Sequence, residues 1–291
     1  MPVPLIEDAP AKVNLTLRVL GRRADGYHEI LSLVAFADFG DRLSLNPGTE
    51  LSLKVHGPRA AQAGDGADNL VLKAARALAA RVPGIVLGAF DLEKNLPVAA
   101  GIGGGSADAA AALRLVARAN ALSLDDLRIA EAARASGADV PVCLEPRPRM
   151  MHGIGEKLSA PLVLPPLHAV LVNPGVALAT KDVFAGWTAS AHPIAPFDLT
   201  APAKDHEQFL HGLAGHANDL EDAAMKLAPV IAEVVAALRE LSGCRLARMS
   251  GSGATCFGLF DTAAGARSAA QALSSKYPDW WVHAGKLGDA R

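Results

Sequence analysis

A glycine-rich loop that runs into an alanine-rich stretch is the part of the sequence best suited to chemistry. Four glycines stand within residues 101–105, and Ser106 follows at once. Glycine adopts backbone angles that other residues avoid, so a ligand can approach the main chain closely. A helix that begins here would direct its unpaired N–H groups and the positive end of its dipole at the loop. The sequence therefore predicts an anion site suited to nucleotide phosphates.

The loop matches neither of two common nucleotide fingerprints. A Walker A loop ends in Gly-Lys-Ser/Thr, whereas Gly105 is followed by Ser106 and an alanine. The dinucleotide pattern Gly-x-Gly-x-x-Gly also fails, because its last position, counted from Gly101, is Ser106. A flexible linker is the other interpretation, and the strong helix formers that follow argue against it. The loop alone does not select a reaction.

Lys12, Asn14 and Asp139 are polar residues in otherwise apolar surroundings. Lys12 and Asn14 share one face of an alternating stretch at 11–20, and a polar face of a strand is most often simply the solvated side. Asp139 is a lone carboxylate where a predicted helix leads into a predicted strand. A turn or capping role explains Asp139, taken alone, as well as catalysis does.

An aromatic pair and a second glycine-serine loop add binding candidates. Tyr27, one of two tyrosines, follows an Asp-Gly turn and precedes His28. An aromatic side chain there could cover the core, or it could stack on a nucleobase, which is worth about 1–3 kcal/mol. The loop at 250–254 reads Ser-Gly-Ser-Gly-Ala. It is a tight turn between strands, or it shares an anionic ligand with the first loop.

Composition excludes several classes of partner. The formal net charge of −2 leaves no basic field for a nucleic-acid backbone, so we expect no nucleic-acid partner. An anionic substrate must then be attracted by a local feature. The N-terminus lacks the basic start and apolar run of a signal peptide, and no stretch of about eighteen apolar residues suggests a membrane span.

Cysteine and histidine spacing predicts neither a disulfide framework nor a metal site. The three cysteines are odd in number and lack metal-ligand spacing: Cys143, Cys244 and Cys256. A reduced, cytoplasmic setting follows. Three histidines recur every five residues, which scatters them around a helix: His206, His211 and His216.

Periodicity and turn signals predict alternating strands and helices. Strands are expected at 9–21, 30–36, 42–55 with Asn-Pro-Gly at 46–48 as punctuation, 90–94, 169–174, 245–249, 255–260 and 280–284. Helices are expected at 69–78, from the glycine loop to about 120, from Thr180, over 218–241 with a division at Pro229, and from about 261 to 276. One more helix should begin at Ser123, with Asp126 completing a capping box, and should end at Gly137 in a left-handed stop. The stretch 189–207 is polar, contains several prolines and is expected to be mobile.

These motifs, in this order, resemble the GHMP kinase superfamily. The order is a lysine strand at 10–15, a Pro-x-x-x-Gly-Ile-Gly-Gly-Gly-Ser loop from Pro97 before a helix, and the late loop at 250–254. The motifs at 23–28 and 137–141 narrow the resemblance to members with a cytidine diphosphate substrate. The sequence departs from the usual pattern by alanine at 99 and 100, and by Ala-Asp at 107–108, where Asp108 brings negative charge near phosphates.

The resemblance implies an α+β fold of two domains. Residues 1–158 would form an ATP-binding domain like domain 2 of ribosomal protein S5, and residues 159–291 a ferredoxin-like domain whose last strand could return to the first. It also implies ATP-dependent phosphorylation of the 2-hydroxyl of the methylerythritol unit in a substrate that carries a cytidine diphosphate group, in the non-mevalonate route to isoprenoids. Two alternatives remain, a GHMP kinase for another small alcohol and a non-catalytic nucleotide-binding regulator.

The resemblance also implies roles for individual residues. Lys12 and Asp139 would be the catalytic pair. The residues expected to bind ATP are Asn69, Lys94, Pro97, Gly101, Gly103, Gly104, Gly105 and Ser106. The residues expected to bind the substrate are Asn14, Tyr27, His28, Thr180, Phe184, Ser250, Gly251, Ser252 and Gly253. Mg²⁺ is expected with ATP, although no carboxylate in the matched motifs is an obvious ligand for it. A monomer or a weak homodimer is expected.

Overall fold

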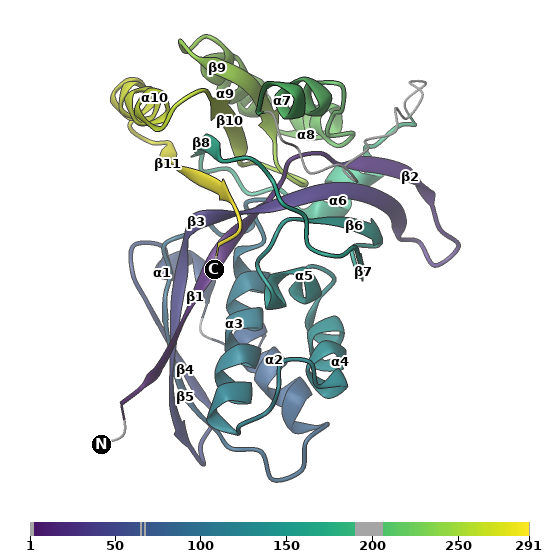
Figure 1. Ribbon diagram of the computed structural model, residues 1–291, viewed down its shortest axis with the longest axis vertical. Coiled ribbons are helices and arrows are strands. Elements are labelled where there is room, and N and C mark those ends of the chain that lie inside the picture. The colour runs from purple at the N-terminus through teal and green to yellow at the C-terminus, as the bar shows by residue number, and fades with distance from the viewer. Residues whose placement is uncertain (1–2, 65, 67, 190–205, 291) are drawn as a thin grey trace. The chain divides into compact units, whose positions relative to one another are not determined.

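The computed structural model describes residues 3–64, 66, 68–189 and 206–290 (Figure 1). The chain forms two compact units, each assembled from separate stretches. The first unit holds residues 1–11, 39–98 and 103–146, and the second holds residues 12–38, 99–102 and 147–291. The predicted boundary at 158/159 concerns two consecutive domains and stays a prediction. The predicted mobility of 189–207 falls almost entirely outside the described residues.

The sheet of the first unit contains β4 (Ser52–His56), β5 (Leu87–Glu93) and the C-terminal part of β3 (His28–Gly48). β5 runs parallel to β4 and antiparallel to β3, which also pairs with β1 (Leu5–Asn14). The predicted strands at 30–36 and 42–55 are therefore wrong in their division, because β3 continues through Pro47. Gly88 permits this close pairing, since a Cβ there would lie 2.1 Å from the Asn46 oxygen.

The helices of the first unit are α1 (Ala60–Ala63), α2 (Leu70–Ala79), α3 (Gly104–Ala119), α4 (Leu127–Ser136) and α5 (Val140–Leu144). Figure 1 shows α2 to α5 gathered on one side of β4 and β5. The α3 positions 107 and 109–112 are buried alanines. Their small side chains let neighbouring helices approach closely, which positions the start of α3.

The predicted start of α4 is wrong, and its predicted end at Gly137 is confirmed without the predicted left-handed conformation. The helix begins at Leu127, because the side chain of Asp126 caps it by accepting from the Arg128 backbone N–H. Ser123 is therefore not the cap. At the other end Gly137 has φ 169°, which is extended backbone rather than a left-handed stop. Cap choice among neighbouring Ser and Asp residues depends on the direction from which the chain enters the helix, and the sequence pattern does not show that direction.

The second unit is built on an antiparallel sheet in the order β3-β11-β8-β10-β9. These strands are β11 (Trp281–Gly288), β8 (Leu167–Asn173), β10 (Cys256–Phe260) and β9 (Cys244–Met249). β3 also pairs with β2 (Arg18–Arg22) and β6 (Arg149–Gly153), and β6 pairs with β7 (Lys157–Leu158). Buried Val170 and Val172 of β8 pack with α9 residues such as Val234 in one core.

The helices of the second unit are α6 (Thr180–Ala185), α7 (His206–Ala214), α8 (Glu221–Leu227), α9 (Val230–Arg239) and α10 (Ala263–Lys276). Pro229 separates α8 from α9, in agreement with the predicted division. Proline has no N–H to continue the helical hydrogen bonds. Within the described part of the chain, no helix is long and apolar enough to cross a membrane.

The predicted strand at 9–21 is interrupted. Leu15 and Thr16 both direct their backbone N–H groups at the carbonyl of Leu33, at 2.8 and 3.4 Å. The Leu17 N–H donates instead to Ala217. Regular pairing with β3 therefore stops after Asn14 and resumes at Arg18. Alternation of polar and apolar residues does not reveal such a break, because the interruption depends on a segment two hundred positions away in the chain.

Candidate active site

The start of α3 presents backbone N–H groups at the glycine loop. Gly103 precedes the helix with φ 64°, a left-handed conformation, and no side chain caps the first turn. The first intrahelical bond runs from Ala107 N to Gly103 O at 2.8 Å. The earlier N–H groups therefore point along the helix axis, together with the positive end of the dipole. This geometry suits a phosphate group.

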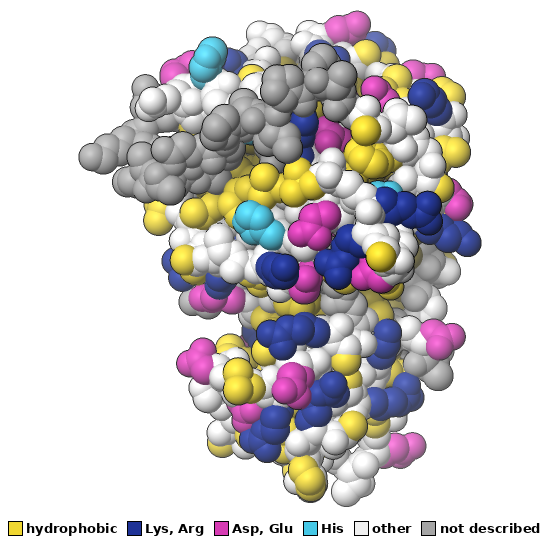
Figure 2. Space-filling model, turned by 90° about the vertical axis from the view of Figure 1, so that its right-hand side faces the viewer, with side chains coloured by type: hydrophobic (Ala, Val, Ile, Leu, Met, Phe, Trp, Pro, Cys, Tyr) yellow, Lys and Arg dark blue, Asp and Glu magenta, His cyan; other side chains and the backbone are white. Residues whose placement is uncertain are grey.

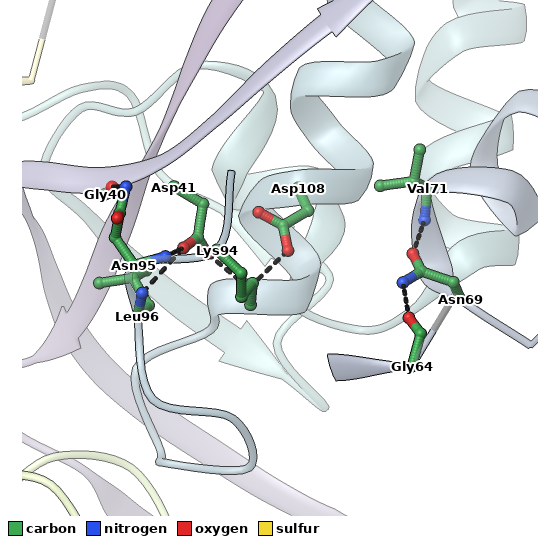
Figure 3. A network of polar contacts seen from close by, with 9 residues as sticks. All are labelled: Gly40, Asp41, Gly64, Asn69, Val71, Lys94, Asn95, Leu96 and Asp108. Carbon is green, nitrogen blue, oxygen red and sulfur yellow. Dashed lines mark hydrogen bonds and ion pairs between the residues drawn. The ribbon is translucent and has the colours of Figure 1, made fainter. Parts of the chain in front are cut away.

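A buried ion cluster lies beneath this helix start (Figure 3). The Lys94 ammonium bonds to Asp41, and it lies 2.6 Å from Asp108 Oδ2. The side chain of Lys94 is only 4% exposed. Asp41 also accepts the backbone N–H groups of Asn95 and Leu96 at 2.6 and 2.8 Å. The cluster therefore ties the beginning of the glycine loop to β3 and to α3.

Burial controls the charge state of the cluster. Burial has the largest effect on Asp108 and raises the pKa of its carboxyl group to about 8. Lys94 lowers this pKa, and Asp41 raises it further. Burial acts to lower the pKa of Lys94, but the two carboxyl groups outweigh it and hold that pKa above 10.5. Lys94 is thus charged at neutral pH, and Asp108 is mostly protonated. The negative charge that the sequence places near the phosphates is therefore largely absent at neutral pH.

Asn69 holds the start of α2, and Gly104 lets the start of α3 approach Lys94. The Asn69 side chain caps α2 by accepting from the Val71 N–H at 3.0 Å, and it donates to Gly64 O at 2.9 Å (Figure 3). A Cβ at Gly104 would lie 3.3 Å from the Lys94 ammonium. Glycine at position 104 therefore lets the helix start lie directly against the buried lysine. Pro97 is buried, Ser106 is half-buried and Gly105 is exposed.

Asp139 immediately precedes α5 in the first unit. The strand predicted after it is wrong, because residues 140–144 form a short helix with Pro141 in its first turn. Proline is tolerated there, since the N–H it lacks would have no intrahelical partner. The Asp139 side chain makes no capping hydrogen bond to α5, so the capping interpretation is not supported. The carboxylate is half-buried.

In the second unit the end of β1 meets the late loop. The Asn14 backbone N–H donates to the Ser250 hydroxyl at 3.0 Å, and that hydroxyl donates to Gly101 O at 3.0 Å. Lys12 donates its backbone N–H to Ile102 O at 2.9 Å. The structure therefore brings four predicted site residues together here: Lys12, Asn14, Gly101 and Ser250. Lys12 and Asp139 belong to different units, and their pairing stays a prediction.

Asn14 is buried, and half of its side-chain amide is satisfied. Its Nδ2 donates to the Ser32 hydroxyl at 2.7 Å. Its Oδ1 is buried, and no hydrogen-bond donor reaches it from the described residues. A Cβ at Gly251 would lie 3.2 Å from this oxygen and 2.8 Å from Gly101 O. Glycine at 251 thus leaves room above the amide, which suits a ligand hydroxyl that donates to Oδ1.

The predicted substrate residues of α6 also have partners in the second unit. Thr180 Oγ1 and Ser252 Oγ lie 3.0 Å apart. The His28 ring stacks on Phe184, with centroids 4.9 Å apart and an interplanar angle of 27°. Tyr27 is 61% exposed. Thr180, which contacts the late loop, and the aromatic ring of Phe184 therefore lie on one short helix, about a turn apart.

Three residues near these predicted positions were missed by sequence reasoning. The Trp187 ring meets His28 edge-on at 5.7 Å, and its position three residues after Phe184 could have suggested this. Asn218 Nδ2 holds the late loop by donating to Met249 O and Gly251 O at 2.9 and 2.8 Å. The buried Arg248 donates to Leu15 O at 2.6 Å. An arginine in an apolar strand was a signal that it holds carbonyl groups.

Local electrostatics, rather than net charge, must attract an anionic ligand. On the face shown in Figure 2, basic and acidic side chains are interspersed. Burial lowers the pKa of His28 below its usual 6.5, and Arg22 lowers it further. His28 is therefore neutral at pH 7 and can both donate and accept hydrogen bonds.

Comparison with known proteins gives the family. The family description "GHMP kinases N terminal domain" matches residues 69–145, and "GHMP kinases C terminal" matches residues 199–279. A Rhodopseudomonas palustris (strain BisB18) protein named 4-diphosphocytidyl-2-C-methyl-D-erythritol kinase is 59% identical over 98% of this chain and 95% of its own length. A Bradyrhizobium diazoefficiens protein of the same name is 56% identical over 98% of this chain and 99% of its own length.

Comparison with solved structures agrees with these sequence matches. A crystal structure of 4-(cytidine 5'-diphospho)-2C-methyl-D-erythritol kinase is similar with a TM-score of 0.74 and 38% identity, over 98% of this chain and 99% of that one. A homoserine kinase from Cytophaga hutchinsonii has a TM-score of 0.73 at 20% identity, over 99% of this chain and 96% of that one, and shows the fold alone. The predicted α+β fold and the predicted resemblance are confirmed: this chain belongs to the GHMP kinase family.

Proposed function

We propose that this protein transfers the γ-phosphoryl group of ATP to the 2-hydroxyl of 4-diphosphocytidyl-2-C-methyl-D-erythritol, giving the 2-phosphate and ADP. The observation that carries the proposal is the 59% identity, over 98% of this chain, to a relative that bears that kinase's name. The aromatic face of Phe184 beside His28 supports it, because a cytosine ring can stack there. Homoserine and mevalonate carry no ring to stack, so they are weaker candidates.

ATP would bind with its phosphates at the start of α3. Gly101, Gly103, Gly104, Gly105 and Ser106 would surround the phosphates, and the uncapped first turn of α3 supports this placement. Pro97 would shape the loop, and Asn69 would lie near the nucleoside. Lys94 would act indirectly, through the loop at Gly104, because two carboxyl groups enclose its ammonium.

Mg²⁺ would arrive bound to ATP. Asp41 and Asp108 both bind the Lys94 ammonium, and Asp108 Oδ1 has no hydrogen-bond partner among the described residues. Mg²⁺ in such sites keeps several waters and is bound through the substrate phosphates together with one or two carboxylates. The metal would neutralise charge that develops on the phosphoryl oxygens.

Lys12 and Asp139 would carry the chemistry, an assignment that rests on the family resemblance. The substrate hydroxyl oxygen attacks the γ-phosphorus, the bond from that phosphorus to the β,γ-bridging oxygen breaks, and ADP leaves. Asp139 takes the hydroxyl proton. Lys12 would stabilise charge on the transferring group. Asn14, whose Oδ1 lacks a donor among the described residues, would accept a hydrogen bond from the substrate near the reacting end.

The acceptor would bind in the second unit. Tyr27 and Phe184 would sandwich the cytosine, and neutral His28 would hydrogen-bond its polar edge. Since His28 stacks on Phe184, the base must use the other face of Phe184 or displace the histidine ring. Thr180 and the late loop, Ser250 to Gly253, would close around the substrate phosphates. The 3.0 Å contact between Thr180 and Ser252 supports their common role.

Turnover with the cytidyl substrate tests the proposal. The protein is incubated with ATP, Mg²⁺ and 4-diphosphocytidyl-2-C-methyl-D-erythritol, and ADP release is followed together with the mass of the phosphorylated product. Homoserine and mevalonate replace the acceptor in parallel reactions. We expect product with the cytidyl substrate only. Turnover with another alcohol, or with none, would overturn the assigned substrate.

Asp139→Asn separates an enzyme from a nucleotide-binding regulator. We expect ATP affinity to stay within a few-fold while kcat falls by about 10²–10⁴, the usual cost of losing a positioned base. Full activity in the variant would reject the role of Asp139.

The predicted cytoplasmic location and the monomer or weak homodimer state stay predictions. Light scattering during size-exclusion chromatography measures the oligomeric state.

A further inference from the structure

One guanidinium group joins three segments of the first unit. Arg114 lies on α3 and its side chain is 10% exposed. Its Nε donates to Glu7 Oε2 at 2.9 Å, and one terminal nitrogen donates to Asp8 O at 2.7 Å. The other terminal nitrogen donates to Cys143 O at 2.9 Å and to Leu144 O at 3.5 Å. A largely enclosed arginine with this many acceptors fixes the geometry of what it binds.

The carbonyls of Cys143 and Leu144 are the last two of α5. A five-residue helix has no interior to stabilise it, and its final carbonyls lack partners within the helix. Arg114 supplies N–H donors at that end, and its positive charge suits the negative end of the helix dipole. The other end of α5 carries Asp139 as the N-cap residue. The position of Asp139 therefore depends on a bond made one turn away.

The same helix that carries Arg114 begins at the phosphate cradle. Gly104 starts α3, and a rise of about 1.5 Å per residue places Arg114 roughly 15 Å along the axis. Because α3 is continuous, a group held by Arg114 is held relative to the helix start. We propose that Arg114 is a positioning residue for phosphoryl transfer, which fixes α5 and with it the Asp139 carboxylate against α3. This inference rests on the proposed role of Asp139.

Arg118 provides a matched control on the same helix. It lies one turn further along α3, donates to Glu7 Oε1 at 2.9 Å and to Ile6 O at 2.8 Å, and is 46% exposed. Both arginines thus hold the β1 end through Glu7. The bonds to α5 belong to Arg114. Any effect that comes from holding β1 should appear in both variants, whereas an effect on Asp139 should appear in Arg114 variants only.

The experiment compares Arg114→Ala, Arg114→Lys and Arg118→Ala in the turnover assay, with circular dichroism and thermal unfolding of each. We expect Arg114→Ala to lose between about ten- and a hundredfold in kcat, since a misplacement of about 1 Å costs on the order of a hundredfold. KM for ATP should change little, and added guanidinium ion should restore part of kcat. Arg118→Ala should keep kcat within twofold. If Arg114→Ala does not fold, Arg114→Lys decides, because it keeps the charge and loses the forked geometry.

A double variant shows whether Arg114 acts through Asp139. Adding Arg114→Ala to Asp139→Asn should lower kcat no further, because residues that act as a unit are not additive. A folded Arg114 variant with normal kcat, an equal loss in Arg118→Ala, or fully additive losses would each overturn the inference. Failure of the proposed catalytic role is distinguishable, because Asp139→Asn alone would then remain active.

Discussion

Asn14 donates its backbone N–H to the hydroxyl of Ser250 at 3.0 Å, although 236 positions separate them in the sequence. The same hydroxyl donates to the carbonyl of Gly101 at 3.0 Å. Ser250 is fully buried. One hydroxyl thus joins three segments that sequence reasoning had placed at the site separately, namely the lysine strand, the glycine loop and the late loop.

Ser250→Ala should therefore destabilise the protein. The change leaves a buried N–H and a buried carbonyl without this partner, which costs about 1–3 kcal/mol in the free energy of unfolding. Urea unfolding at pH 7 measures it. Ser252→Ala is the comparison, because Ser252 is 9% exposed and its hydroxyl lies 3.0 Å from that of Thr180. That variant should lose less stability and should raise KM for the cytidyl substrate. Equal stability of the two variants would contradict this account of Ser250.

Gly101→Ala should impair both stability and turnover. Gly101 has φ 74°, and a Cβ there would lie 2.5 Å from Ser250 O. The side chain would push the late loop away from the glycine loop. Gly175→Ala is the control, because φ is 80° and nothing lies within 4 Å of a Cβ there. Gly175→Ala should lower the free energy of unfolding only by the strain of the left-handed conformation, about 1–2 kcal/mol. Thermal unfolding and kcat of both variants test the difference, and equal losses would show that the contact with Ser250 is unimportant.

Asp108→Asn should change how stability depends on pH. The folded pKa of about 8 lies above the ordinary value of 3.8, so the folded state keeps a proton that the unfolded state releases. Wild-type stability from this group is therefore lost as pH rises from about 4 to 8. Asparagine cannot ionise, so the variant should gain stability relative to the wild type across that window and level off above it. Urea unfolding over a pH series measures this.

Asp126→Asn is a control of opposite sign. Arg128 and a backbone N–H hold the pKa of Asp126 at about 2, below its ordinary 3.8. The stability contributed by Asp126 is therefore present above about pH 4 and is lost as pH falls toward 2. The difference between Asp126→Asn and the wild type should be constant from pH 5 to 8. For the Asp108 prediction, parallel curves of unfolding free energy against pH for Asp108→Asn and the wild type would contradict a neutral, buried carboxyl group.

Substrate binding should weaken in acid through His28. Burial and Arg22 keep the His28 pKa below 6.5, so the ring is neutral at pH 7 and accepts a hydrogen bond. Protonation removes that acceptor. As pH falls below 6.5, kcat/KM for the cytidyl substrate should decline, while KM for ATP changes less. His28→Gln should show a lower but flatter profile. The same acid decline in His28→Gln would assign the titration to another group.

Local sequence was sufficient for several elements. The helix predicted at 69–78 forms as α2 at 70–79, and Asn69 caps it by accepting an N–H two residues away. The glycine loop and α3, and the division of α8 from α9 at Pro229, follow from backbone preferences of the residues themselves. Errors arose where local preferences competed. Asp126 caps α4 in place of Ser123, and the stretch after Asp139 is helix because its strand pattern was only five residues long.

The sequence by itself determined the motifs, their order and the family, since each motif is a short run whose chemistry depends on neighbouring residues. Only the tertiary structure decided that Lys94 lies buried between Asp41 and Asp108, that Trp187 meets His28, and that Arg114 holds the end of α5. The physical reason is distance along the chain. A hydrogen bond or ion pair acts over about 3 Å, and which remote residues come within that distance is set by packing of the whole fold.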